Sequence, residues 1–198
     1  MTTPRWFTDT KDGHSQWYAE RFRALAEEGA DLAGEARLVN ALVQPASSVL
    51  DAGCGTGRLG AALHSFGHEV VGVDVDAVLV AEARAQHAGP TWVEADLAGL
   101  DLGRTFDAVV TAGNVMVFLA PGTEGDVVRR LAAHVAPGGV LVLGFRLDWH
   151  YGVDGLDTDL AAAGLVLEQR FATWDLRPFD SSAEFAVSVA RQPEAGRT

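Results

Sequence analysis

The sequence has 198 residues, enough for one compact α/β domain with a buried core and too few for a second of similar size. Its 48% hydrophobic and 21% charged residues are ordinary for a globular protein and argue against disorder over the whole chain. The 27 acidic residues outnumber the 15 Lys and Arg residues, giving a formal net charge of −12. Such a chain is repelled by phosphate backbones, so we expect no nucleic-acid partner.

The cysteine count and the hydrophobic runs bear on the compartment. Cys54 is the single cysteine, so no intramolecular disulfide can form, as expected in a reducing compartment. The first seven residues lack the apolar core of a signal peptide, and the longest apolar run, 140–145, is too short to cross a bilayer. We therefore predict a cytoplasmic protein without a membrane partner, and leave its oligomeric state open.

The first part of the chain has helical periodicity. Trp17, Phe22 and Leu25 can share one face of a helix that ends near Gly29, with Trp17 expected in the core. A second helix is expected from Leu32 to the residues before Pro45. Residues 1–46 are thus predicted to form an N-terminal helical cap.

From residue 48 the pattern alternates between strand and helix. Strands are expected at 48–50, 69–74, 91–94, 106–111 and 140–145, with Pro137-Gly138-Gly139 turning the chain into the last of them. Helices are expected at 58–66, from the Asp76 N-cap to 87, and at 123–135. Repeated β-α-β units of this kind predict a parallel sheet covered by helices on both faces.

The end of the chain has a different pattern. A short helix at 158–163 precedes two strand-like runs, 165–173 and 183–190, which we expect to pair antiparallel. The division predicted is one domain over 1–198, with a core at 47–191 and a flexible tail at 192–198.

A glycine-rich segment, Val49 to Gly60, stands between the first strand and the following helix. Open α/β sheets bind ligands at this place. The glycines alone are ambiguous, because Gly55, Gly57 and Gly60 also satisfy the dinucleotide-binding spacing G-x-G-x-x-G. Asp51, just upstream, would repel an anionic pyrophosphate and attract a cationic nucleoside.

Two further acids follow the next two strands. Asp74 ends the second strand, where an acid accepts hydrogen bonds from ribose hydroxyls, a feature that serves several nucleoside cofactors. Asp96 follows the third strand and could accept from an adenine amino group. The alternative reading of either acid is a helix cap.

The run from Val49 to Gly60 resembles motif I of the class I S-adenosylmethionine-dependent methyltransferases. Asp74, the pair Ala95-Asp96 and the Pro137-Gly138-Gly139 turn are similar to that family's later motifs, and the resemblance covers about 48–145. It implies a Rossmann-like, doubly wound α/β fold with seven strands in the order 3-2-1-4-5-7-6 and the last strand antiparallel.

The resemblance also implies S-adenosylmethionine as cofactor and S-adenosylhomocysteine as product. Gly53, Gly55 and Gly57 would lie under the methionine part, Asp51 would face its amino group, Asp74 the ribose and Asp96 the adenine. Cys54 in the loop is expected to be a small packing residue. The full set of expected cofactor contacts is Asp51, Gly53, Cys54, Gly55, Gly57, Asp74, Val75, Ala95, Asp96, Leu97, Ala112 and Gly113.

The catalytic residues are harder to infer. A sulfonium methyl group is already activated, so the protein mainly has to align the acceptor and exclude water, and it needs a base only for an acceptor that holds its proton. Weak candidates are Asn114, otherwise a loop turn, and His150, otherwise an exposed loop residue. The wider set of acceptor-site or lid candidates is His14, Trp17, Tyr18, Asn114, Trp149, His150 and Tyr151.

The segment 111–116 lacks the Pro-Pro-aromatic motif of the enzymes that methylate amino groups of DNA bases, and no cysteine stands there for cytosine-C5 chemistry. No metal site is expected, because Gly67 separates His64 from His68. We therefore predict methyl transfer to a small molecule. An NAD(P)-dependent oxidoreductase, a non-catalytic S-adenosylmethionine-binding protein and an aminopropyl transferase remain as alternatives.

Overall fold

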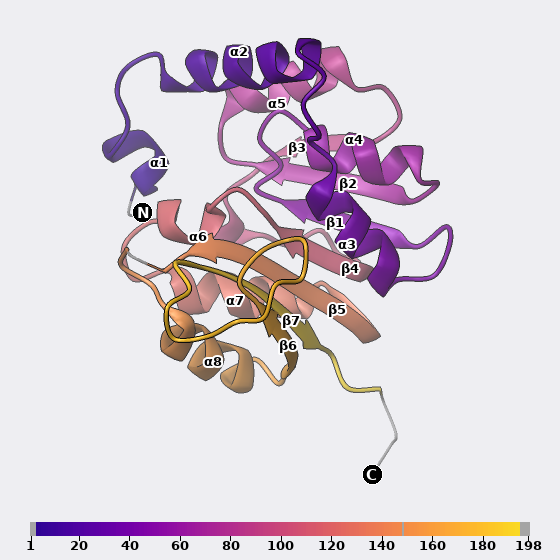
Figure 1. Ribbon diagram of the computed structural model, residues 1–198, viewed down its shortest axis with the longest axis vertical. Coiled ribbons are helices and arrows are strands. Elements are labelled where there is room, and N and C mark those ends of the chain that lie inside the picture. Colours follow the sequence, from indigo (N-terminus) through magenta and orange to yellow (C-terminus); the bar gives the residue numbers. More distant parts are fainter. Residues whose placement is uncertain (1–2, 148, 195–198) are drawn as a thin grey trace.

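A seven-stranded sheet forms the centre of the molecule (Figure 1) in the computed structural model, which describes residues 3–147 and 149–194. The strand order is β3-β2-β1-β4-β5-β7-β6, and β7 pairs antiparallel with both of its neighbours. This is the strand order, with one reversed strand, that the resemblance to the methyltransferase family implied. The strands are β1 (Ser48–Ala52), β2 (Glu69–Asp74), β3 (Thr91–Glu94), β4 (Phe106–Thr111), β5 (Val135–Arg146), β6 (Val166–Phe171) and β7 (Phe185–Arg191).

Helices cover both faces of this sheet. The helices are α1 (Arg5–Thr8), α2 (His14–Glu27), α3 (Gly34–Leu42), α4 (Arg58–Ser65), α5 (Ala77–Gln86), α6 (Val115–Phe118), α7 (Glu124–Ala133) and α8 (Val153–Ala162), with a 3₁₀ turn, η1 (Leu97–Gly99). α3 and α4 pack together on one face, whereas α7 packs against both α8 and η1 on the other.

The two core layers follow from alternation along strands that are buried on both sides. In β5, Leu141 and Leu143 face the α7 layer, whereas Val140 and Val142 face the α3–α4 layer. Burying such a side chain contributes about 1.5–3 kcal/mol. Near-continuous Val and Leu runs therefore mark central parallel strands, and they made these strands predictable.

The largest departure from the predicted elements is at the start of β5. Pro137-Gly138-Gly139 is not a turn before the strand but lies inside it, because the pairing register with β4 shifts between Phe106 and Ala108. Gly138 has φ +78, which favours glycine at this irregularity. In addition, α8 begins five residues earlier than predicted, and the four-residue helices α1 and α6 were not predicted.

Three glycines leave room for one tryptophan. A Cβ atom at Gly57, Gly60 or Gly72 would lie 2.3–2.8 Å from the indole ring of Trp92, which reaches from β3 into the α5 side of the sheet. Gly57 and Gly60 thus allow α4 to pack closely on this ring. Two of the three glycines in the G-x-G-x-x-G spacing are therefore explained by packing.

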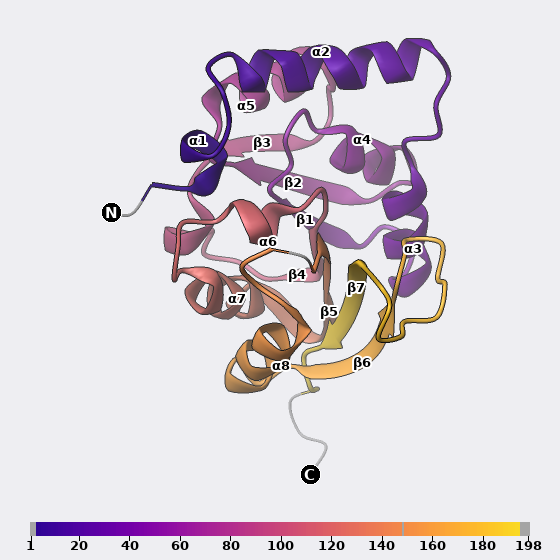
Figure 2. The same cartoon turned by 60° about the vertical axis from the view of Figure 1, so that its left-hand side comes forward.

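The first two helices lie apart from α3 (Figure 2). α2 packs on α5, and α1 lies beside α6. The prediction that Trp17 belongs to the core was wrong, because its side chain is 50% exposed. The one buried residue of α2 is Ala19. Of the tail predicted at 192–198, residues 195–198 lie outside the described residues. No helix in the described part of the chain has the length and apolarity to span a membrane.

Candidate functional site

A cleft opens at the carboxyl ends of β1, β2 and β4, where the sheet order reverses. This is the place where an open α/β sheet is expected to bind a ligand. The lining residues are Pro4, Trp6, Tyr18, Asp51, Gly53, Cys54, Gly55, Thr56, Arg58, Leu59, Asp74, Val75, Leu79, Asp96, Leu97, Ala112, Gly113, Val115, Phe118 and Leu119.

The glycine loop is tied to β2 by its own backbone. The N–H groups of Gly53 and Cys54 both donate to the carbonyl of Val73, at 2.7 and 2.9 Å. Gly53 has φ +83, and a Cβ atom there would lie 2.3 Å from the Val115 side chain. The loop therefore forms the floor of the cleft only because this position has no side chain.

Asp51 lies under this loop and is 1% exposed. Its Oδ2 accepts a hydrogen bond from the Gly60 N–H at 3.0 Å, and among residues 3–147 and 149–194 no donor meets Oδ1. Burial raises the pKa of the Asp51 carboxyl to about 7, against the opposing effect of the Arg58 guanidinium. A cation bound in the cleft would stabilise the ionised form of this carboxyl.

Asp74 joins the loop to the next helix. Its Oδ2 accepts from the Gly55 N–H at 2.8 Å, and its Oδ1 accepts from the Asp76 N–H at 2.9 Å. Burial raises the pKa of Asp74, although these two backbone donors favour the charged form. Each oxygen keeps a further lone pair, so the carboxylate can accept two more hydrogen bonds from a ligand.

Asp96 stands at the far end of the cleft, beyond β3. Its side chain accepts from the Ala98 N–H at 2.9 Å and caps η1, and the residue also lines the cleft. The two readings that the sequence left open, a helix cap and a pocket acid, thus apply to the same side chain. Val75 and Leu97 provide apolar surface between Asp74 and Asp96.

Residues 3–13, which we call the N-terminal strap, close one side of the cleft. The Trp6 indole N–H donates to Oδ2 of Asp76 at 2.7 Å, and the Ser15 hydroxyl donates to the same oxygen. Asp76 is 2% exposed and also caps α5 through the N–H groups of Val78 and Leu79, as the sequence predicted. One buried carboxylate thus links a helix start to the strap.

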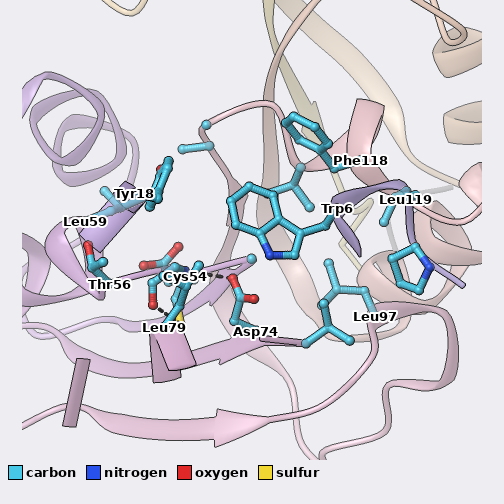
Figure 3. Close-up of a pocket in the computed structure, with 18 of the residues that line it drawn as sticks. Trp6, Tyr18, Cys54, Thr56, Leu59, Asp74, Leu79, Leu97, Phe118 and Leu119 are labelled. Atoms are coloured by element: carbon cyan, nitrogen blue, oxygen red, sulfur yellow. Dashed lines mark hydrogen bonds between the residues drawn. The ribbon is translucent and has the colours of Figure 1, made fainter. Parts of the chain in front are cut away.

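The Trp6 indole stands inside the cleft, between the wall that holds Tyr18 and the wall that holds Phe118 (Figure 3). Its ring centroid lies 5.6 Å from that of Tyr18 and 5.4 Å from that of Phe118, both edge to face. Sequence reasoning missed Trp6, since a helix of only four residues is too short to show a periodic pattern.

Tyr18 is the one predicted lid residue that lines the cleft. Its hydroxyl lies 3.8 Å from where a Cβ atom of Gly113 would stand, so it reaches across to the end of β4. Burial raises the pKa of this hydroxyl, which keeps it protonated near neutral pH.

Three predicted lid residues stand around the cleft without lining it. His14 packs behind Trp6, with ring centroids 4.8 Å apart. Trp17 packs on His14 on the outside of α2, and the exposed Trp149 packs on Phe118, with centroids 5.4 Å apart. These rings support the cleft wall from outside.

Three other candidates point elsewhere. Asn114 has φ +69, and its Oδ1 accepts from the Arg146 N–H at 3.0 Å, which is the loop-turn role left open above. Tyr151 is buried in the α7–α8 layer and donates to Asp159 at 2.6 Å, and His150 is exposed and does not line the cleft.

Among the expected cofactor contacts, Gly57 and Ala95 do not line the cleft, and the other ten do. Gly57 packs on Trp92, and Ala95 packs into the core layer while its N–H donates to the Asp74 carbonyl. Cys54 lines the cleft and also packs with Trp92, Val80 and Ala83.

A family model described as "Methyltransferase domain" matches residues 49–139. The chain is 38% identical to a "TehB-like SAM-dependent methyltransferase" from Corynebacterium glutamicum. The crystal structure of that protein superimposes with a TM-score of 0.86, over 93% of this chain and 100% of that one.

Curated relatives include two enzymes named as sugar N,N-dimethyltransferases. The dTDP-3-amino-3,4,6-trideoxy-α-D-glucopyranose enzyme of Streptomyces venezuelae is 33% identical over 68% of this chain and 56% of its own length. The dTDP-3-amino-3,6-dideoxy-α-D-glucopyranose enzyme of Streptomyces fradiae is 38% identical over 59% of this chain and 45% of its own. This chain therefore spans about half the length of these relatives. Further relatives are named as methyltransferases of ribosomal RNA and of ribosomal protein L11.

The Asp51 carboxyl gives the free protein a defined pH dependence. Burial raises its pKa from about 4 in the unfolded chain to about 7 in the folded one, so between these values the folded chain binds more protons. The free energy of unfolding should consequently fall as the pH rises through this window. Asn cannot ionise, so Asp51→Asn should not show this decrease. The free energy of unfolding of the variant, relative to that of the unsubstituted chain, should therefore rise by about 1–4 kcal/mol between pH 4 and 8. Urea unfolding without ligand at several pH values measures this difference, and a difference that does not change with pH would contradict it.

The strap should open more often when Trp6 loses its bond to Asp76. Trp6→Phe keeps a ring but removes the N–H, and a hydrogen bond to a charged group contributes about 1.5–3 kcal/mol. Amide hydrogen exchange at Arg5 and Asp9, whose N–H groups are bonded in the closed strap, should accelerate about 10-fold or more. Trp17→Phe makes the same chemical change outside the cleft and should leave these rates unaltered. Equal acceleration in both variants would refute the role of Trp6.

Proposed function

The chain belongs to the class I S-adenosylmethionine-dependent methyltransferases, and we propose that its own reaction transfers the methyl group of this cofactor to a small-molecule acceptor. The observation that carries the proposal is the buried Asp51 carboxylate at the glycine loop, with Asp74 and Asp96 along the same cleft. Negative groups in this order suit a cationic, phosphate-free nucleoside.

The proposed cofactor contacts follow this order. The ammonium group meets the free Oδ1 of Asp51, and Gly53 and Gly55 lie beneath the methionine part. The ribose hydroxyls donate to the remaining lone pairs of Asp74. The adenine amino group donates to Asp96, and its ring lies between the apolar groups of Val75 and Leu97.

When bound, the cofactor supplies a methyl carbon that the acceptor's lone pair attacks in line while the bond to sulfur breaks. The chain's part is to align the acceptor and to exclude water from this exchange. Trp6, Phe118 and Leu119 provide an apolar, partly aromatic wall for that purpose. Neither Asn114 nor His150 lines the cleft, and neither is assigned as a base.

Three observations support a small-molecule acceptor. The strap narrows the cleft with Pro4 and Trp6, which favours a compact acceptor over a folded macromolecule. The net charge of −12 disfavours nucleic acid. Two relatives carry names that specify amino-sugar acceptors, so sugars with a free amine are the first compounds to test.

Cofactor choice is tested by thermal unfolding with S-adenosylmethionine, S-adenosylhomocysteine, NAD and NADP. A ligand far above its dissociation constant should raise the melting temperature by several degrees, and we expect this of the two sulfur compounds alone. Asp74→Ala should abolish the shift through loss of the ribose contacts. A shift with a dinucleotide, or an unchanged shift in Asp74→Ala, would contradict the assignment.

Acceptor class is tested by methyl incorporation from labelled S-adenosylmethionine. Amine-bearing sugars and other small amines should become labelled, and ribosomal RNA and ribosomal protein should not. Asp51→Asn, which weakens the contact with the cofactor's ammonium group, should lower the rate about 10-fold or more. Labelling confined to the macromolecules would overturn the small-molecule proposal, and no labelling with intact cofactor binding would favour a non-catalytic protein.

A further inference from the structure

Arg58 is the first residue of α4 and the one cation among the residues that line the described cleft. It stands on the same side as Asp51, close enough for the two charges to influence each other's pKa. The Phe22 ring lies against its guanidinium, 5.2 Å from the ring centroid. The glycine-loop end of the cleft thus presents one negative and one positive group.

Part of the Arg58 guanidinium is already bonded. Nη1 donates to the Leu32 carbonyl at 2.8 Å and to Oε2 of Glu35 at 3.0 Å, and Nη2 donates to Oε1 of Glu35. The Glu35 carboxylate therefore accepts hydrogen bonds from both terminal nitrogens of the guanidinium. The Arg58 and Glu35 side chains are only 20% and 15% exposed, so this pair holds the charge in one position.

The other edge of the guanidinium has no partner in the described part of the chain. A guanidinium has five N–H groups, and the contacts above use three of them. The remaining two, on Nε and on the outer side of Nη2, point the same way and form a fork. Such a fork matches the two oxygens of a carboxylate.

We propose that this free edge of Arg58 binds the carboxylate of the cofactor's amino-acid end, and that the chain thereby selects a cofactor whose amino acid is intact. This inference rests on the proposed function. An α-amino acid carries its ammonium and carboxylate groups on one carbon, so it can meet Asp51 and Arg58 together. Decarboxylated S-adenosylmethionine, the donor for aminopropyl transfer, lacks the group that Arg58 binds. Arg58 is thus a specificity residue that favours methyl over aminopropyl transfer.

The test compares two ligands that differ in the amino-acid end. S-adenosylhomocysteine carries the carboxylate, whereas 5′-methylthioadenosine has neither the carboxylate nor the ammonium group. Calorimetric titration of Arg58→Gln should show S-adenosylhomocysteine weakened about 10–100-fold, as expected for a charge-assisted pair. The affinity for 5′-methylthioadenosine should stay within about twofold, and this binding also reports that the variant keeps its cleft.

Glu35→Gln is the matched control, because it breaks the same ion pair but keeps the Arg58 charge. It should retain S-adenosylhomocysteine affinity to within a few fold. The double variant Arg58→Gln/Glu35→Gln removes both charges, so it leaves no unpaired Glu35, and should behave as Arg58→Gln does.

Equal weakening of both ligands in Arg58→Gln would assign the residue a structural role and overturn the inference, as would unchanged S-adenosylhomocysteine affinity. If the unsubstituted chain bound neither ligand, the proposed function itself would fail. That result is distinct from either of the first two.

Discussion

The burial of one carboxylate under a glycine loop is the constraint on which the rest of the site depends. Asp51 stands at the end of β1 with a single backbone donor, and its ionised form is costly in the free protein. A buried charge of this kind is stabilised by a partner of opposite sign. A cationic ligand in the cleft would add to the stabilisation that the Arg58 guanidinium already gives the ionised Asp51, which suits a cofactor that carries an ammonium and a sulfonium group.

The neighbouring pair Asp74 and Asp76 couples the cofactor position to the cover of the cleft. Asp74 holds the glycine loop on one side and the Asp76 backbone on the other. Asp76 starts α5 and receives the Trp6 indole and the Ser15 hydroxyl. A ligand that binds Asp74 thus contacts a carboxylate that is bonded to the backbone of Asp76, the residue that holds the strap. Cofactor binding and strap closure can therefore stabilise each other through these two carboxylates.

Much of this fold was predictable because its strands are short apolar runs buried on both faces. The run 106–111 matches β4 residue for residue, and the Asp76 cap of α5 was predictable because Asp is a preferred residue immediately before a helix. The start of β5 was mispredicted, since Pro-Gly-Gly is typical of turns and the register shift that accommodates it depends on the partner strand.

The site residues were predictable where residues near in sequence act together. Those whose roles depend on contacts distant in sequence were not predictable. Asp51, Gly53 and Gly55 share one loop, and all three line the cleft. Trp6 reaches Asp76 across 70 positions, and Arg58 acquires its orientation from Glu35 on another helix. Gly57 belongs to the recognised motif, yet the tryptophan against which it packs lies on β3. These long-range contacts leave no local pattern.

The site depends on Asp51 and the glycine loop receiving the ammonium group of an amino-acid end. Crystal structures of the chain grown with S-adenosylhomocysteine and, separately, with NAD would show what they receive. We expect the homocysteine ammonium within hydrogen-bond distance of Asp51 Oδ1 and the adenine beside Asp96. A pyrophosphate seated over Gly53 and Gly55, with the homocysteine compound absent from the cleft, would contradict this expectation.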